Sequence, residues 1–234
     1  EHNKMPVVEL TLMSCAPSFD VATRTEALAH SMRLYNAVGT TGVFEGHGVA
    51  AEVVEAYRRL HAANRQTVRG TLVFSPAWGA TGDADVGEMV RSWARWLAGS
   101  GLGDDWLRLQ GIYTEVDDSV ETRLRAAAAP QTGWAGFHYD SAIPRERVRD
   151  VLIEAARNGL QAVGIFPYML EMFDEVDRVA PIGGLRWVQG HLATLTGDQI
   201  SRMHDLGVAV TTHTSNHIYK RGHVHLENLA PERE

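Results

Sequence analysis

Short apolar strands alternate with helical stretches along almost the whole chain, and this alternation limits the fold more than any other feature. Six strands are predicted, each separated from the next by a helix. A strand, a helix and another strand in succession favour parallel strands joined by right-handed crossovers. The sequence therefore predicts an α/β protein. The strands are expected within residues 40–46, 67–75, 106–116, 160–166, 186–191 and 208–212.

Several of the intervening helices carry recognisable ends. Pro144 stands in the first turn of one helix and Gly159 follows its end, an asymmetry typical of helix termini. Asp83 is expected to cap another helix, in which Trp93 and Trp96 are predicted to pack against the sheet. The helices are expected over residues 23–38, 50–65, 83–99, 144–158, 168–179 and 196–207, with a less regular segment over 119–129.

Two architectures fit the alternation: a (β/α)8 barrel of the TIM type and an open doubly wound sheet. The sequence contains neither G-x-G-x-x-G nor G-x-x-x-x-G-K-[ST], which removes the main support for a nucleotide-binding open sheet. The barrel is therefore favoured, although a complete barrel needs eight strands and six are predicted. We expect one domain over residues 1–234, with an irregular lead-in over 1–22.

Composition narrows the classes of partner. The chain has 234 residues, 44% of them hydrophobic, which is enough for a sizeable core. Its net charge of -7 and scattered basic residues argue against nucleic acid and anionic membranes. No apolar run is long enough to span a membrane and no signal peptide is visible, so a cytoplasmic location is expected. Cys15 is the only cysteine, which excludes an internal disulfide. The expected partner is a small molecule.

Polar side chains follow five of the six predicted strands. Barrel enzymes carry their chemistry there, because the loops at the carboxyl ends of the strands share one mouth. Ser75 lacks the G-x-S-x-G context of a nucleophile, and Tyr113 is interpreted as barrel filling. The candidates for substrate or metal contact at these ends are Glu45, His47, Trp78, Glu115, His191 and His213.

Imidazoles combined with a carboxylate suit a divalent metal such as Zn²⁺, which activates water and polarises carbonyl groups. Such a site needs about three protein ligands. His191 and Glu115, together with His213 or His47, could supply them. The alternative is that these histidines are hydrogen-bonded packing residues. His138 in "FHYD" is a further candidate for substrate contact, with turn hydrogen bonding as its alternative.

Two stretches carry a family resemblance: "GTTGVFEGHGVAAEVVEAYRRLHAANR" and "GLRWVQGHLATLTGDQISRMHDLGVAVTTHTSNHIYKRG". From about Thr25 onward the chain resembles the amidohydrolase superfamily, in its YtcJ-like, amidohydrolase-3 group. The resemblance implies a metal-dependent (β/α)8 barrel that hydrolyses carbon–nitrogen bonds of small molecules. It also implies that the six predicted strands correspond to strands two to seven of that barrel.

The same resemblance assigns roles to individual residues. His191 takes the position of the metal ligand on strand six, whereas Tyr113 and Ile165 stand where the family has ligands on strands four and five. A binuclear centre is therefore not expected; Glu115 could serve in a single-metal site, or this branch has lost the metal. In the loop after the last predicted strand, His213, Asn216 and Tyr219 could meet the substrate.

The family's His-x-His pair and its general-base aspartate belong to two strands that are not predicted here. We therefore expect the chain to be the central part of a longer protein. The leading hypothesis is a hydrolase that uses metal-activated water on an amide or cyclic amide. The alternatives are an inert barrel that binds a small ligand, and a metal-free lyase or isomerase in which Glu115 and a catalytic histidine, His191 or His213, act as acid and base. Open sheet edges predict poor solubility or assembly into a homo-oligomer.

Overall fold

The computed structural model describes residues 19–76, 84–116, 142–165, 168–192, 195–212 and 215–228. All six predicted strands and the six helices predicted between them and before the first are confirmed, while the segment over 119–129 lies outside the described residues. The repeating elements are α2 (Val21–Ala37), β1 (Gly42–Val49), α3 (Ala51–Ala62), β2 (Arg69–Phe74), α5 (Val86–Leu97), β4 (Leu107–Tyr113), α7 (Arg145–Arg157), β7 (Ala162–Ile165), α8 (Met169–Asp177), β8 (Val188–Leu192), α9 (Gly197–Leu206) and β9 (Ala209–Thr212).

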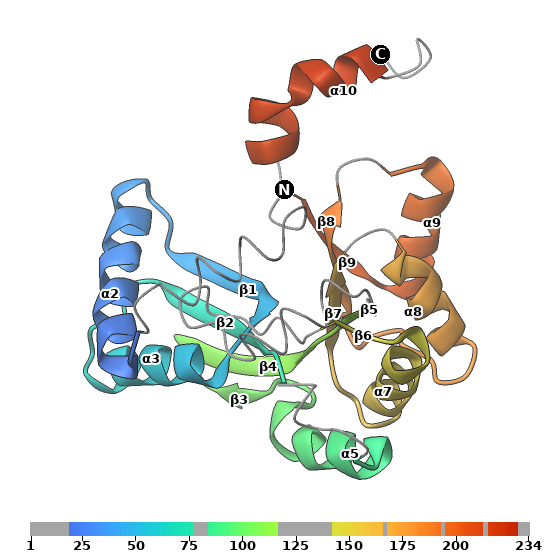
Figure 1. Cartoon of the computed structure of the whole chain (residues 1–234), viewed down its shortest axis with the longest axis horizontal. Coiled ribbons are helices and arrows are strands. Elements are labelled where there is room, and N and C mark those ends of the chain that lie inside the picture. The colour runs from blue at the N-terminus through green and yellow to red at the C-terminus, as the bar shows by residue number, and fades with distance from the viewer. Residues whose placement is uncertain are drawn as a thin grey trace, which may run out of the picture.

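These six strands form one parallel sheet in the order β1-β2-β4-β7-β8-β9. The sheet curls, and the helices cover its convex face, so the described strands make a half-barrel with edges at β1 and β9 (Figure 1). The α/β prediction is confirmed. Smaller elements complete the described residues: β3 (Leu102–Gly103) runs antiparallel to β4, β5 (Glu115–Val116) pairs with β6 (Ala142–Ile143), and η2 (Ser215–Lys220) leads into α10 (Gly222–Asn228).

Side-chain caps fix where several helices begin. Thr196 and Gln199 form a capping box at α9, in which each side chain bonds the backbone N–H of the other residue. The expected cap of α5 was wrong: Asp85, not Asp83, accepts the backbone N–H of Glu88. The side chain at the cap accepts a backbone N–H of the first turn, three residues later. Because Asp85 plays this part, α5 starts later than the sequence pattern predicts.

The larger part of the core lies between the convex face of the sheet and the helices. Trp187 is fully buried there; its indole N–H donates to the Leu160 carbonyl at 2.9 Å, and its ring meets Phe173 edge-on. Phe74 of β2 contacts the rings of Trp93 and Trp96 of α5, which confirms their predicted packing role. Each such large side chain contributes about 1.5–3 kcal/mol through burial.

A second, smaller apolar cluster lies on the concave face of the sheet. It comprises Val73, Tyr113, Val163, Ile165 and Val188, all at most 6% exposed. These residues come from four neighbouring strands, as expected for side chains that fill the interior of a barrel. The half-barrel therefore already has a packed interior floor.

Candidate active site on the concave face

Three of the six strands lose regular side-chain alternation near their carboxyl ends. In each, one strand carries more residues than its neighbour between two successive pairs, which defines a β-bulge. One extra residue, as in β4 and β8, turns the side chains that follow it to the opposite face of the sheet, whereas two extra residues, as in β1, change the direction only of the side chains within the bulge. The irregular intervals are Glu45 to Val49 in β1, Leu109 to Ile112 in β4 and Gln189 to Leu192 in β8.

The bulge in β8 brings His191 into the interior. Trp187 and Leu192 pack in the core beneath the helices, while Val188 belongs to the concave cluster. Regular alternation from Val188 would direct His191 toward the helices. Instead His191 adopts a left-handed backbone with φ of +59°, and its ring lies against His47 of β1. Histidine enters this region more readily than most residues, but the conformation still stores strain that persists only where the surroundings enforce it.

The bulge in β1 does the same for His47. Glu45 and Val49, on either side, both contact the helix side of the sheet. Regular alternation would place His47 there as well. Two extra residues between these positions carry the His47 ring to the concave face instead, where it meets Tyr113.

In β4 the extra residue is accommodated at Gly111, which has φ of +68°. Leu109 and Ile112 on either side both pack toward the helices, so Tyr113 turns to the concave face. A β-carbon at residue 111 would lie 2.7 Å from the Gln161 carbonyl oxygen of the adjacent chain segment. Only glycine fits both this backbone angle and this approach.

The three bulged strands therefore bring His47, Tyr113 and His191 together, and we call these residues the histidine–tyrosine cluster. The ring centre of His47 lies 5.1 Å from that of Tyr113 and 5.1 Å from that of His191, with both pairs edge-to-face. Because carboxyl ends of parallel strands share one edge, the cluster lies where a barrel presents its reactive groups. The three side chains carry two imidazoles and one phenol, groups that bind metals or transfer protons.

Gly48 and Ser75 form the wall beside this cluster. A β-carbon at residue 48 would lie 2.7 Å from the Tyr113 β-carbon and 2.8 Å from the Ser75 β-carbon. The side chains of Ser75 and Tyr113 therefore start on the same side of the sheet, directly against the Gly48 backbone. Ser75 itself is fully buried.

Glu45, predicted to contact substrate, is held by the helix layer. The hydroxyl of Tyr57 in α3 donates to its carboxylate at 3.0 Å. Burial raises the pKa of Tyr57, and the Glu45 carboxylate raises it further, so the hydroxyl stays protonated as a donor. The described contact of Glu45 thus anchors α3 to β1, and its substrate role stays a prediction.

The spacing of the two histidines is compatible with a shared metal ion. Two imidazoles bound to one tetrahedral Zn²⁺ through nitrogens at about 2.0 Å would have ring centres about 5 Å apart. His47 and His191 meet this condition. Ile165 lies on the concave face, where the resemblance expects a ligand, and contributes an apolar surface there. Among the side chains that the structure describes, no three His, Cys, Asp or Glu residues gather closely enough to hold a metal ion.

The other predicted site residues either lie outside the described residues or stand apart from the cluster. Trp78, His138 and His213 lie outside the described residues, as do the side chains of Glu115 and Asn216. Tyr219 belongs to η2 and is 88% exposed. Figure 1 shows η2 and α10 standing apart from the half-barrel. The roles given to these six residues therefore stay predictions.

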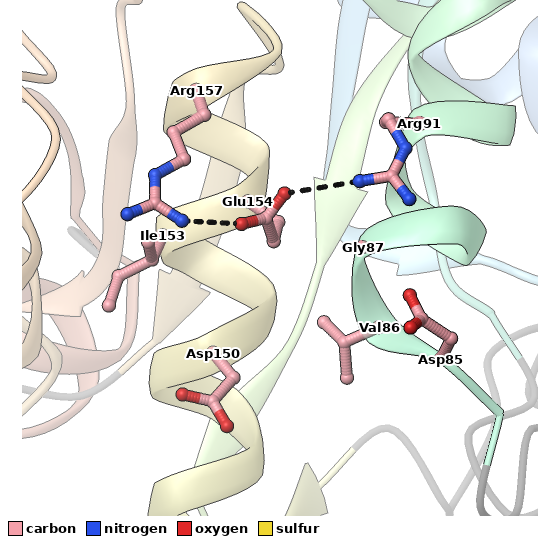
Figure 2. A pocket seen from close by; sticks show the side chains of 8 residues that line it. All are labelled: Asp85, Val86, Gly87, Arg91, Asp150, Ile153, Glu154 and Arg157. Carbon is pink, nitrogen blue, oxygen red and sulfur yellow. Dashed lines mark hydrogen bonds and ion pairs between the residues drawn. The ribbon is translucent and has the colours of Figure 1, made fainter.

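A groove of about 460 Å³ lies elsewhere, on the outer surface between α5 and α7. Figure 2 shows that Glu154 bridges two arginines there, Arg157 at 2.7 Å and Arg91 at 3.9 Å. Asp85 and Asp150 complete its charged lining. This exposed ion-pair network ties two neighbouring helices together and lies in the helix layer, not at the carboxyl ends of the strands.

Comparison with known proteins supports the fold. The chain resembles the crystal structure of an uncharacterized metal-dependent hydrolase from Pyrococcus horikoshii OT3, with a TM-score of 0.57 and 16% identity over 84% of this chain. A second such hydrolase, from Pyrococcus furiosus, gives a TM-score of 0.54 and 16% identity over the same share. The chain spans only 38% and 39% of these two structures. The sequence matches no protein-family model and no curated protein.

At this level of identity the likeness is one of fold. It agrees with the curled half-barrel of parallel strands. In the part of the chain that the structure describes, no helix is long and apolar enough to cross a membrane.

The sequence places both histidines at strand ends and predicts that Tyr113 fills the barrel. Tyr113 does belong to the buried apolar cluster on the concave face, and its ring also contacts His47. For Ser75 the sequence excludes a nucleophile and predicts no other role. The sequence carries a partial signal: glycine interrupts the strand in "FEGHG", "LQGIY" and "VQGHL", the three segments that bulge, but Gly70 of β2 and Gly164 of β7 lie in strands without an extra residue. Glycine inside a strand often marks a bulge, and a bulge changes which face the next side chains occupy.

Proposed function

We propose that this chain carries part of the active site of a metal-dependent hydrolase that acts on a small molecule. The observation that carries the proposal is the meeting of His47 and His191 on the concave face, at the carboxyl ends of two strands of a half-barrel. Both structural neighbours are named metal-dependent hydrolases, which supports the same class. A divalent ion bound there, with Zn²⁺ as the first candidate, would activate water for attack on a carbonyl group.

Each residue of the site would have its own role. His47 and His191 would hold the ion through ring nitrogens, with Glu115 or His213 as candidates for a further ligand. The strained backbone of His191 would fix the direction of its ring. Tyr113, against the edge of His47, would orient that imidazole and lie beside the bound substrate. The apolar floor beneath them would exclude water from that side.

The finer assignments belong to the same proposal. We infer a carbon–nitrogen bond of an amide or cyclic amide as the target, because the resemblance to amidohydrolases implies it. We also infer that further strands complete a (β/α)8 barrel around the concave face. The part of the neighbours' length that this chain does not span leaves room for such strands.

A second candidate is a metal-free lyase or isomerase. It is favoured by Tyr113, because a phenol next to an imidazole, here that of His47, can donate or accept a proton without any metal. Activity that persists in a chelator would distinguish this candidate from the hydrolase.

The test is metal analysis of the purified protein, by inductively coupled plasma mass spectrometry, for the unmodified chain, His47→Gln and His191→Asn. Asparagine is chosen at residue 191 because it tolerates the left-handed backbone while removing the imidazole. The matched control is His61→Gln, since His61 contacts Asp104 on the outer surface at 3.0 Å. We expect one ion per chain in the unmodified protein and in the control, and much less than one ion per chain in both cluster variants, because damage to a metal site typically lowers its affinity at least tenfold. Equal metal content in all four proteins, or none in any, would sink the metal-dependent mechanism.

A further inference from the structure

Ser75 combines complete burial with an unsatisfied hydroxyl. Its side chain is 0% exposed, and its Oγ has no hydrogen-bond partner among the described residues. The backbone N–H of Ser75 donates to the Val49 carbonyl at 3.2 Å, which fixes the residue at the end of β2 next to β1. A buried hydroxyl without a partner destabilises the folded state, so its presence calls for an explanation.

The direction of the Ser75 side chain supplies that explanation. A β-carbon at residue 48 would lie 2.8 Å from the Ser75 β-carbon and 2.7 Å from the Tyr113 β-carbon. Ser75 therefore leaves the sheet on the concave face, beside Tyr113, whose ring touches His47. The absence of a side chain at Gly48 lets β1 approach both residues closely, because a β-carbon there would collide with them.

We propose that Ser75 is a substrate-binding residue of the histidine–tyrosine cluster, and that its hydroxyl donates a hydrogen bond to an oxygen of a small carbonyl compound. The class of compound rests on the proposed function, because a hydrolase of amides must hold a carbonyl oxygen near its activating group. The position of Ser75 does not rest on it. A buried serine hydroxyl without a protein partner can both donate and accept, so it regains a hydrogen bond when a polar group, such as a carbonyl oxygen, enters the site.

Thr114 provides a matched control. It is also 0% exposed, and its Oγ1 also has no partner among the described residues. Its N–H donates to the Val163 carbonyl at 3.3 Å, which extends the pairing of β4 and β7 by one residue. Because Tyr113 points to the concave face, alternation directs Thr114 to the opposite face, away from the cluster.

The experiment uses the full 234-residue chain loaded with Co²⁺. Acetohydroxamate, a small amide analogue whose oxygens also bind metals, is titrated into the unmodified protein, Ser75→Ala and Thr114→Val by calorimetry, with a parallel titration of the metal-free proteins. We expect Ser75→Ala to weaken binding about three- to tenfold, the size of one hydrogen bond. Thr114→Val should leave the affinity unchanged. Neither variant should unfold at a lower temperature than the unmodified chain, because each removes an unsatisfied buried group.

Equal affinities in Ser75→Ala and the unmodified chain, or no binding by either, would overturn the assignment. Equal losses in Ser75→Ala and Thr114→Val would also overturn it, because they would indicate a general effect on packing. The two proposals can fail separately. If the chain binds no Co²⁺ but its metal-free binding of acetohydroxamate still depends on Ser75, the metal-dependent mechanism fails and the role of Ser75 stands.

Discussion

His47, Tyr113 and His191 meet because their backbones break the rule of alternation. Each would face the helices in a regular strand, and each faces the concave side after a bulge. The unusual backbone angles of these bulges are confined to a left-handed conformation at His191 and to glycine at two other positions. At the residue scale the candidate site is therefore a product of backbone geometry as much as of side-chain chemistry.

Gly48 offers the sharpest test at this scale. Its φ is +81°, and a β-carbon there would collide with Ser75 and Tyr113. Gly39 has the same φ of +81° but has no atom within 4 Å of the equivalent position. Gly39→Ala should therefore cost only the left-handed penalty of about 1–2 kcal/mol. Gly48→Ala should cost a further 1–3 kcal/mol or so from overpacking.

Urea unfolding of the two glycine variants measures this difference directly. Both substitutions carry the same backbone penalty, so the excess destabilisation of Gly48→Ala reports the contact with Ser75 and Tyr113. Equal destabilisation by the two variants would contradict the close approach of β1 to these side chains.

At the scale of elements, turns set where the strands begin. Asp104 joins β3 to β4: its Oδ1 accepts the backbone N–H groups of Trp106 at 2.8 Å and Leu107 at 3.0 Å. Its other oxygen lies 3.0 Å from His61 of α3. These backbone hydrogen bonds, with a smaller contribution from His61, hold the pKa of Asp104 below its usual range. The carboxylate thus links a turn of the sheet to the neighbouring helix.

The lowered pKa of Asp104 predicts a stability change in acid. The charged carboxylate favours the folded state fully above the unfolded-state pKa of about 4, and this contribution is lost as pH falls through the lower folded-state pKa. Asp104→Asn keeps an acceptor but loses the charge, so its melting temperature should approach that of the unmodified chain as pH falls from 6 to 3.

Thermal unfolding followed by circular dichroism across this pH range provides the measurement. Asp105→Asn is the control, because the Asp105 side chain is fully exposed next to the same turn. A difference between Asp104→Asn and the unmodified chain that stays constant with pH would rule out the proposed role of the charge.

At the scale of the whole molecule, the open edges of the sheet are the main liability. Among the described strands β9 pairs only with β8, and all four of its residues are exposed. The Ala209 N–H donates to the Trp187 carbonyl at 2.8 Å. In a parallel strand successive N–H groups alternate in direction, so the N–H of Val210 points to the open side. Unpaired edges of this kind promote association with another chain.

This alternation predicts different effects on association and stability for two proline substitutions in β9. Val210→Pro removes an outward donor and should leave the pairing with β8 intact, while reducing self-association of the chain. Thr211→Pro, one residue later, removes a donor that faces β8 and should destabilise the fold by about 3 kcal/mol. Sedimentation velocity and thermal unfolding measure the two effects. Unchanged association of Val210→Pro, in a folded protein, would show that the β9 edge is not the contact.

The sequence by itself determined the order of elements. Apolar periodicity and turn residues are local, so six strands, six helices and their parallel arrangement could all be predicted from short windows. The same reasoning placed His191 and His47 at strand ends. It could not tell the face of the sheet to which they point, since regular alternation directs both histidines toward the helices.

Only the tertiary structure decided the composition of the candidate site. Whether a glycine in a strand produces a bulge depends on which residues pair across the sheet, and pairing joins segments far apart in the chain. The burial of Ser75 and the contact of His47 with both Tyr113 and His191 follow from those pairings. Local sequence thus determined which residues stand at the strand ends, and long-range register decided which of them meet.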